Sequence, residues 1–359
     1  MSTEPAEASG DPDVGAGFKR LRRVGVLAAA LPMTAAMICL PIFPGFTISD
    51  VFFREQDLPV LCVTGLALLL LPVRWLDAGR WGGAVAFLEQ RPRALALIVA
   101  GLTFLVALAG VFLVCRDYPL SVDEFLATFD AQIFRRGAIL ARVAELWRPL
   151  VPALQPIYLL DVADHSAWSS SYYPMNAAFQ ALLSLAGLRR AAGAGWAALS
   201  VMLTFGLARR LWPMRPGAAV VATALLATSS QVLFTAMTPY AMSAHLGLNL
   251  LWLTLFLRRD RASPFAALAV AFAACGLHQL IFHPLFAAPF IAQLWIERRW
   301  RRAIFYTAGY AAIGVFWASY WRIALSTVQL AATASVERGP HYLTDTLICL
   351  LYTSDAADE

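Results

Sequence analysis

Long apolar runs constrain this chain more than any other feature of its sequence. The run from Ala94 to Cys115 contains no charged residue and matches the roughly 20 residues with which a helix crosses a bilayer. Backbone groups inside hydrocarbon must bond within their own segment, so such runs are expected to be helices. Hydrophobic residues make up 60% of the chain and charged residues only 14%, too few to cover a soluble surface. We therefore predict an all-α, polytopic membrane protein.

Arginine and lysine residues cluster at the ends of these runs, where they indicate the cytoplasmic side. This explains the net charge of +5 without a nucleic-acid partner. The pattern predicts about nine spans, an N-terminus in the cytoplasm and a location in the plasma (inner) membrane of a bacterium. The short apolar segment Pro174–Leu188 is expected at the outer interface. The spans are expected at about 24–46, 58–73, 94–115, 193–207, 218–233, 242–257, the two halves of 265–296 on either side of a break at 276–284, and 304–321.

The two ends of the chain are set apart from the predicted transmembrane domain, residues 24–348. Residues 1–23 form an acidic and then basic tail, which we expect to be disordered and cytoplasmic. Residues 349–359 resemble the translation of an adapter used in preparing DNA libraries. We expect this last segment to be foreign to the natural protein, and we exclude it from reasoning about the fold.

A long outer loop, residues 116–191, separates the third span from the fourth, and long loops in membrane proteins often carry function. Apolar residues near its start recur at helical spacing and are followed by Gly137. They predict an amphipathic helix lying along the membrane surface. The apolar positions are Phe125, Leu126, Phe129, Ile133 and Phe134.

Asp123 and Glu124 open this predicted helix, and two interpretations remain open. Ser121 and Glu124 fit the S-x-x-E capping box, in which the serine caps the helix and the glutamate reaches back. Alternatively, a carboxylate beside a membrane has its pKa raised by desolvation and becomes a better general base. Both can hold, because a cap fixes Glu124 and leaves Asp123 free to project. The residues by themselves favour capping.

The outer loop resembles that of a known family. An Asp-Glu pair after an early span, an amphipathic helix ending in Gly, and then Tyr172-Tyr173-Pro174-Met175 with Gly187 are similar to the GT-C glycosyltransferases, closest to protein O-mannosyltransferases and lipid A aminoarabinose transferases. The resemblance implies an inverting transfer from a polyprenyl-phosphate sugar to a lipid, protein or polysaccharide acceptor. It implies Asp123 as the general base, supported by Glu124. Many relatives have Lys-Pro-Pro in place of Tyr173-Pro174-Met175, so a cationic contact to the donor phosphate is missing here.

Other polar residues expected near the outer face are candidates for binding the substrate. His278 and His283 interrupt an apolar run, and ionisable residues at membrane depth are often functional. Their spacing of five does not fit two metal ligands on one helix face, so no metal site is indicated, although a divalent metal is left open. Arg136 suits a phosphate group, and His165 and Tyr173 suit a sugar or acceptor. Hydrogen-bonded interfacial histidines, snorkelling arginines and an aromatic belt are the plain alternatives.

No cofactor is predicted. Neither G-x-G-x-x-G nor G-x-x-x-x-G-K-[ST] occurs, which agrees with a lipid-linked donor in place of a soluble nucleotide. The five cysteines lack C-x-x-C spacing, so they indicate no zinc site. Two other functions remain open as alternatives. One is a transporter or lipid flippase, which would need polar or broken helices at mid-membrane, and the other is a non-catalytic scaffold. Carboxylates and histidines that meet in one cavity would favour the enzyme.

Overall fold

The computed structural model describes residue 34 and residues 58–70, 78–154, 158–162 and 164–324. These residues are mostly helical and fall into two compact units, divided between Ala86 and Phe87. The predicted tail (1–23), the first predicted span (24–46, apart from residue 34) and the adapter-like segment (349–359) lie outside the described residues. The first unit contains α3 (Leu58–Leu70) and most of α4 (Ala78–Gln90).

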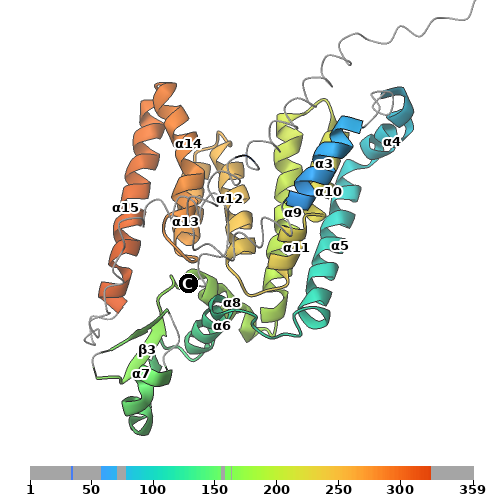
Figure 1. The fold of residues 1–359 in the computed structure, drawn as a ribbon. Coiled ribbons are helices and arrows are strands. Elements are labelled where there is room, and N and C mark those ends of the chain that lie inside the picture. Colours follow the sequence, from blue (N-terminus) through green and yellow to red (C-terminus); the bar gives the residue numbers. More distant parts are fainter. Residues whose placement is uncertain (1–33, 35–57, 71–77, 155–157, 163, 325–359) are drawn as a thin grey trace, which may run out of the picture. The chain divides into compact units, whose positions relative to one another are not determined.

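The second unit holds the remaining elements, drawn in Figure 1. Its first long helix, α5 (Pro92–Leu113), is followed by the outer-loop elements and then by the other long helices. The outer-loop elements are α6 (Val122–Arg135), β1 (Ala141–Arg142), η3 (Glu145–Leu150), α7 (Val151–Leu154), β2 (Leu159–Asp161), β3 (Ala167–Ser170), α8 (Met175–Leu185) and η4 (Arg189–Ala191). The helices after them are α9 (Ala192–Leu211), α10 (Pro216–Ala227), α11 (Ser230–Ala236), α12 (Met242–Phe256), α13 (Ser263–Cys275), α14 (Phe282–Ile296) and α15 (Trp300–Ala324).

Two helical segments of the described chain are long and apolar enough to cross a membrane, Pro92–Leu113 and Arg189–Leu211. A third candidate is the pair α10 and α11, which bends by 58°. The predicted span 218–233 falls on this bent pair. The break has a local cause: Ser229 caps α11 by accepting a bond from the Val232 amide, and Thr228 turns its hydroxyl back to the Ala224 carbonyl. Helices α12, α13 and α14 are apolar but shorter, so the described residues do not confirm nine spans.

The expectation of an all-α chain needs one correction. Three short antiparallel strands form a sheet in the order β1-β3-β2, with Ala141 opposite Trp168 and Leu160 opposite Ser169. The strands are too short to show an alternating pattern in the sequence, and they exist because β3 pairs on both of its edges. Trp168 of β3 packs edge-on against Phe129 of α6, which fixes the sheet to the outer-loop helix.

Helices α6 and α8 lie side by side and pack through small residues: Ala131 from α6 meets Ala177 and Ala181 from α8. Each helix ends in a glycine with a left-handed backbone, Gly137 and Gly187, both at φ +72°. In both cases the amide of the next residue donates to the carbonyl five residues before it, as in a Schellman motif. The glycine stop predicted for the outer-loop helix is confirmed. At 11 residues, α8 is about 16 Å long and too short to span.

The largest hydrophobic core joins α12 to α15 around Trp252, Tyr306 and Trp317. Smaller cores join α5 with α9 and α10, and α5 with α9 and α11. Gly276 ends α13 where a side chain would collide with Trp317, so this position has room only for glycine. The close approach holds the α13–α14 link against Trp317 of α15 and Met175 of α8.

Candidate functional site

A small buried cavity lies where five segments of the second unit meet. Its walls come from α6, the end of β3, the start of α8, the loop before α12 and the α13–α14 link. Its volume is about 20 Å³, room for about one water molecule. The lining residues are Asp123, Ala127, Asp130, Ser170, Tyr172, Tyr173, Asn176, Ala177, Tyr240, Ala241, Leu277 and His278.

Helix α6 supplies two carboxyl groups to this cavity. Asp123, Ala127 and Asp130 are spaced four and three residues apart, which places them on one helix face. That face is turned inward, so Asp123 is 8% exposed and Asp130 only 3%. The sequence analysis missed Asp130 as a site residue, although its position seven residues after Asp123 is a signal for a shared face.

Asp123 accepts a hydrogen bond from the hydroxyl group of Tyr172. The Tyr172 ring stacks on Tyr158 and lies against His278, with ring centroids 5.7 and 4.1 Å apart. Burial and the neighbouring carboxylate raise the pKa of Tyr172, so its hydroxyl keeps its proton. Tyr172 is a second residue that the sequence analysis did not select.

Glu124 takes the capping role. Ser121 is the N-cap of α6 and accepts a bond from the Glu124 amide at 3.4 Å. The Glu124 carboxylate accepts from the Leu120 amide at 3.2 Å, one residue before the position that a standard capping box would use. Burial raises the pKa of Glu124. The two interpretations of this acid pair therefore apply to different residues. Glu124 caps the start of the helix, and Asp123 faces the cavity.

Among the described carboxyl groups outside the long helices, Asp130 has the most strongly raised pKa. Its Oδ1 accepts from the Ser170 amide at 3.2 Å, which joins α6 to the end of β3. Burial raises its pKa from 3.8 to about 7, because removal of water penalises the charged form more than the Ser170 bonds favour it. A carboxyl group of this kind exchanges its proton near neutral pH.

His278 and Tyr173 reach the cavity because the α13–α14 link is tied to the segment before α8. The Tyr173 amide donates to the His278 carbonyl at 3.3 Å, and the Met175 amide donates to the Gly276 carbonyl at 2.8 Å. Burial lowers the pKa of His278 to about 4, so its imidazole is neutral at pH 7 and can donate one hydrogen bond. Tyr173 packs on Trp317 and Tyr320.

Asn176 and Tyr240 are two further polar residues of the cavity wall. Asn176 and Gln180 of α8 both donate to the Pro239 carbonyl, at 3.1 and 2.9 Å, and thereby fix the loop that carries Tyr240. The Tyr240 hydroxyl lies 2.7 Å from the Ser121 hydroxyl. The helix cap, the loop and the cavity are thus parts of one hydrogen-bonded structure.

His283 does not join His278 at the cavity. It lies within α14, is fully buried, and is bonded through Nδ1 to Asn249 of α12 at 2.6 Å and through Nε2 to Tyr310 of α15 at 2.8 Å. The expectation that both histidines meet the carboxylates is therefore wrong for His283. The link ends at Ile281, so His283 already belongs to the next helix and faces its neighbours.

Arg136 and His165 also lie away from the acid cavity. Arg136 is exposed at the end of α6 and lines a separate pocket with Arg135 and Arg189. His165 lies in the turn between β2 and β3, with a left-handed backbone (φ 54°) and partial exposure. Within the described ranges, no group of three histidine, cysteine or acidic side chains is arranged to hold a metal ion.

In comparisons with known proteins, no protein-family model, curated protein or solved structure matches this chain.

Proposed function

We propose that this chain is a membrane glycosyltransferase of the GT-C type, which moves a sugar from a polyprenyl-phosphate donor to an acceptor hydroxyl at the outer face of the membrane. The observation that carries the proposal is the cavity that gathers Asp123, Asp130 and His278 at one end of the long helices. Carboxyl groups and a histidine that share a buried cavity favour an enzyme over a scaffold. The nine-span arrangement and the bacterial inner membrane are part of the same proposal.

In the proposed reaction Asp123 is the general base. The acceptor hydroxyl transfers its proton to the Asp123 carboxylate as its oxygen attacks the anomeric carbon. The bond from that carbon to the phosphate oxygen breaks, and polyprenyl phosphate leaves with the electron pair. A single displacement inverts the anomeric centre, so no sugar–enzyme bond forms.

The contact between Tyr172 and Asp123 supports this role. A phenol hydroxyl already donates to the carboxylate inside the cavity, which is the geometry that an acceptor hydroxyl needs. Because the cavity has room for about one water molecule, the substrates have to displace Tyr172 and widen it. We expect Tyr172 to swing away from Asp123 when the acceptor binds.

The remaining residues have secondary roles in this proposal. Neutral His278 donates a hydrogen bond to the leaving phosphate, and Tyr173 packs beside the sugar. Glu124 supports Asp123 by holding the first turn of α6. Arg136, His165 and His283 do not line the cavity, and we leave them out of the reacting centre.

The proposal is tested with the full chain in membranes, incubated with a panel of labelled polyprenyl-phosphate sugars. We expect one donor to yield a labelled product of inverted configuration together with polyprenyl phosphate. Turnover of soluble nucleotide sugars, with none of the lipid-linked donors, would contradict it. The outer location is tested by Ala138→Cys, next to α6, and Ala262→Cys, at the start of α13. An impermeant maleimide should label the first in intact cells and the second only after permeabilisation.

A transporter is the second candidate, and one observation favours it. The helices α12, α14 and α15 bury the polar chain Asn249–His283–Tyr310 between them, and both ring nitrogens of His245 are buried with no partner in the part of the chain described. Buried ionisable groups between membrane helices mark transport paths in many proteins. Uptake or flipping of a lipid-linked sugar that survives Asp123→Asn but is lost in His283→Phe would favour the transporter.

A further inference from the structure

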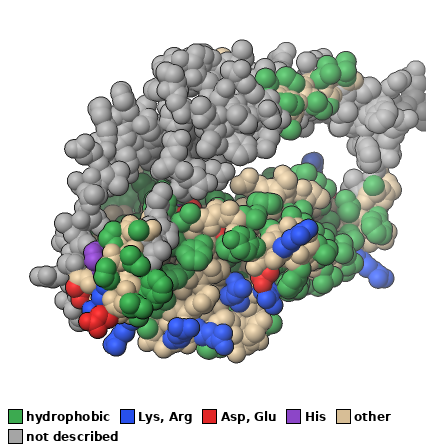
Figure 2. All heavy atoms as spheres, turned by 60° about the horizontal axis from the view of Figure 1, so that its bottom comes forward, with side chains coloured by type: hydrophobic (Ala, Val, Ile, Leu, Met, Phe, Trp, Pro, Cys, Tyr) green, Lys and Arg blue, Asp and Glu red, His purple; other side chains and the backbone are tan. Residues whose placement is uncertain are grey.

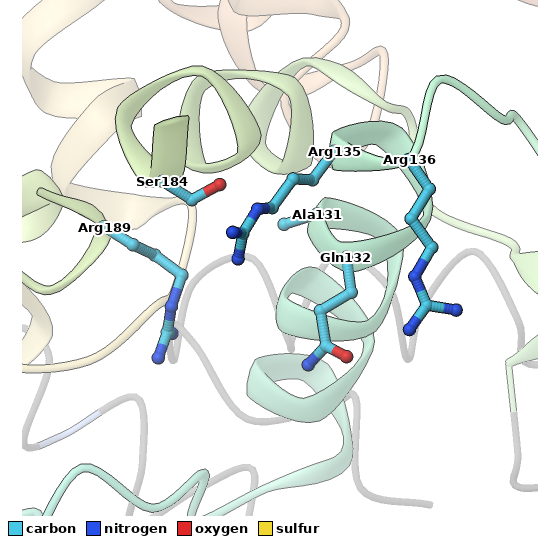
Figure 3. Close-up of a pocket in the computed structure, with 6 residues that line it drawn as sticks. All are labelled: Ala131, Gln132, Arg135, Arg136, Ser184 and Arg189. Carbon is cyan, nitrogen blue, oxygen red and sulfur yellow. The ribbon is translucent and has the colours of Figure 1, made fainter. Parts of the chain in front are cut away.

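A second pocket lies on the other side of α6 from the acid cavity. It has a volume of about 490 Å³, well above the acid cavity and within the range of small-ligand sites. Residues from the end of α6 and from α8 and η4 line it (Figure 3). They are Ala131, Gln132, Arg135, Arg136, Ser184 and Arg189, with no carboxylate among them.

The three arginines make this pocket positively charged. Figure 3 shows Arg135 and Arg136 coming from α6, Arg189 coming from the facing segment, and their guanidinium groups extending toward the same open side. Arg189 has a weak ion pair with Asp117 at 3.6 Å, and Asp117 is bound more closely by Arg190, at 2.6 Å. Among the described residues, Arg135 and Arg136 have no ion pair or side-chain hydrogen bond. Guanidinium groups suit phosphate, which they bind through paired donors.

The surroundings of the pocket point to the membrane surface. Arg189 is the first residue of the candidate span Arg189–Leu211, so the pocket lies at one end of a membrane-crossing helix. Leu182, Leu185 and Leu188 lie beside the pocket residues in sequence and are 64%, 70% and 53% exposed. Figure 2 shows basic side chains next to hydrophobic side chains on the face that comes forward from the bottom of Figure 1. Exposed leucines beside Arg135 and Arg136, which form no ion pair among the described residues, fit a surface that meets acyl chains and headgroups together.

We propose that Arg135, Arg136 and Arg189 bind the phosphate of an anionic membrane lipid, whose acyl chains lie along the exposed leucines of α8. The site is separate from the acid cavity, because α6 presents its carboxylates to one side and its arginines to the other. A lipid seated here links α6 to the start of α9 and so supports the helix that carries Asp123. The proposal does not depend on the transferred sugar.

Binding is measured on the full chain in a neutral detergent, by native mass spectrometry with dihexanoyl phosphatidic acid. The test variant is Arg135→Gln/Arg136→Gln/Arg189→Gln. The matched control, Arg142→Gln/Arg258→Gln/Arg259→Gln, removes the same charge from arginines outside the pocket. We expect the test variant to weaken binding about tenfold or more and the control to bind like the wild type. Equal binding by the test variant and the wild type would overturn the proposal.

Two other probes identify the ligand. Dihexanoyl phosphatidylcholine should bind more weakly than phosphatidic acid, and equal binding would show an apolar contact without a phosphate site. Inorganic phosphate should also bind more weakly, and equal affinity would show a free-anion site in place of a lipid site. If the triple variant aggregates, Arg136→Gln alone should still weaken binding, and no change would overturn the proposal. Asp123→Asn protein should bind phosphatidic acid normally, which keeps this test independent of sugar transfer.

Discussion

The cavity around Asp123 and the helix core around His283 both bury polar side chains, but they do so differently. In the core, both ring nitrogens of His283 are bonded, to Asn249 and to Tyr310, so its hydrogen-bonding capacity is used up. In the cavity, Asp130 accepts a hydrogen bond from the Ser170 amide and has a pKa of about 7, and the His278 imidazole is neutral at pH 7. A saturated hydrogen-bond network stabilises helix packing, whereas buried polar groups with remaining hydrogen-bonding capacity are suited to chemistry.

The largest effect is expected at Asp130. Because its pKa is raised from 3.8 to about 7, the folded chain keeps a proton that the unfolded chain releases between these values. Stability therefore falls as the pH rises through this window, by up to about 4 kcal/mol. Asp130→Asn should remove the dependence and make the protein more stable at pH 8. Thermal unfolding in detergent at pH 5 and pH 8 measures this, and an unchanged pH dependence in the variant would contradict the buried carboxyl group.

A substitution in the helix core around His283 should lower the stability of the protein and leave its transfer rate unchanged. Asn249→Leu leaves the Nδ1 atom of His283 without its partner and should cost about 1–3 kcal/mol. Gln293→Leu, which alters an exposed amide on α14, is the matched control and should change little. Melting curves and transfer rates per folded molecule separate the two effects. A large loss of rate at unchanged stability in Asn249→Leu would place the core in the functional path, as the transporter requires.

A substitution of His278 in the cavity should lower the transfer rate and leave the stability of the protein nearly unchanged. His278→Phe removes the donor to the leaving phosphate and should lower the transfer rate about tenfold to a hundredfold. The melting temperature should hardly move, since the ring stacking on Tyr172 is kept. His278→Gln retains a donor and should recover part of the rate. Gln279→Leu, at the exposed neighbouring position, is the control. Equal rates for His278→Phe and the wild type would remove His278 from the mechanism.

The smallest effect is expected at the helix cap. Ser121→Ala removes the acceptor for the Glu124 amide and should cost about 1 kcal/mol of stability. Ser121→Asn, which can also cap, should restore most of this. The rate per folded molecule should stay close to that of the wild type in both variants. A rate that falls with Ser121→Ala and recovers with Ser121→Asn would mean that the cap positions Asp123 for reaction.

Local patterns in the sequence predicted the parts of the fold that local chemistry controls. Ser121 as N-cap, Gly137 as the helix stop and the apolar helix after Pro92 were all visible in the chain. The three-stranded sheet was not, because its strands are two to four residues long and depend on pairing across the loop. His278 and His283 lie in different places because α14 begins between them, and the four intervening residues, 279–282, do not reveal where that helix starts. The contact of Tyr172 with Asp123 joins residues far apart in sequence, and no spacing rule predicts it.

The role of Asp123 as the base is tested most directly by comparing Asp123→Asn with Asp164→Asn in the transfer assay. Both changes remove one carboxylate from the same outer region, but Asp164 is exposed and bonds to Ser166 in its own turn. With equal amounts of inserted protein, we predict that Asp123→Asn lowers the rate by about a hundredfold or more and Asp164→Asn leaves it unchanged. Full activity in the Asp123→Asn protein would contradict the proposed mechanism.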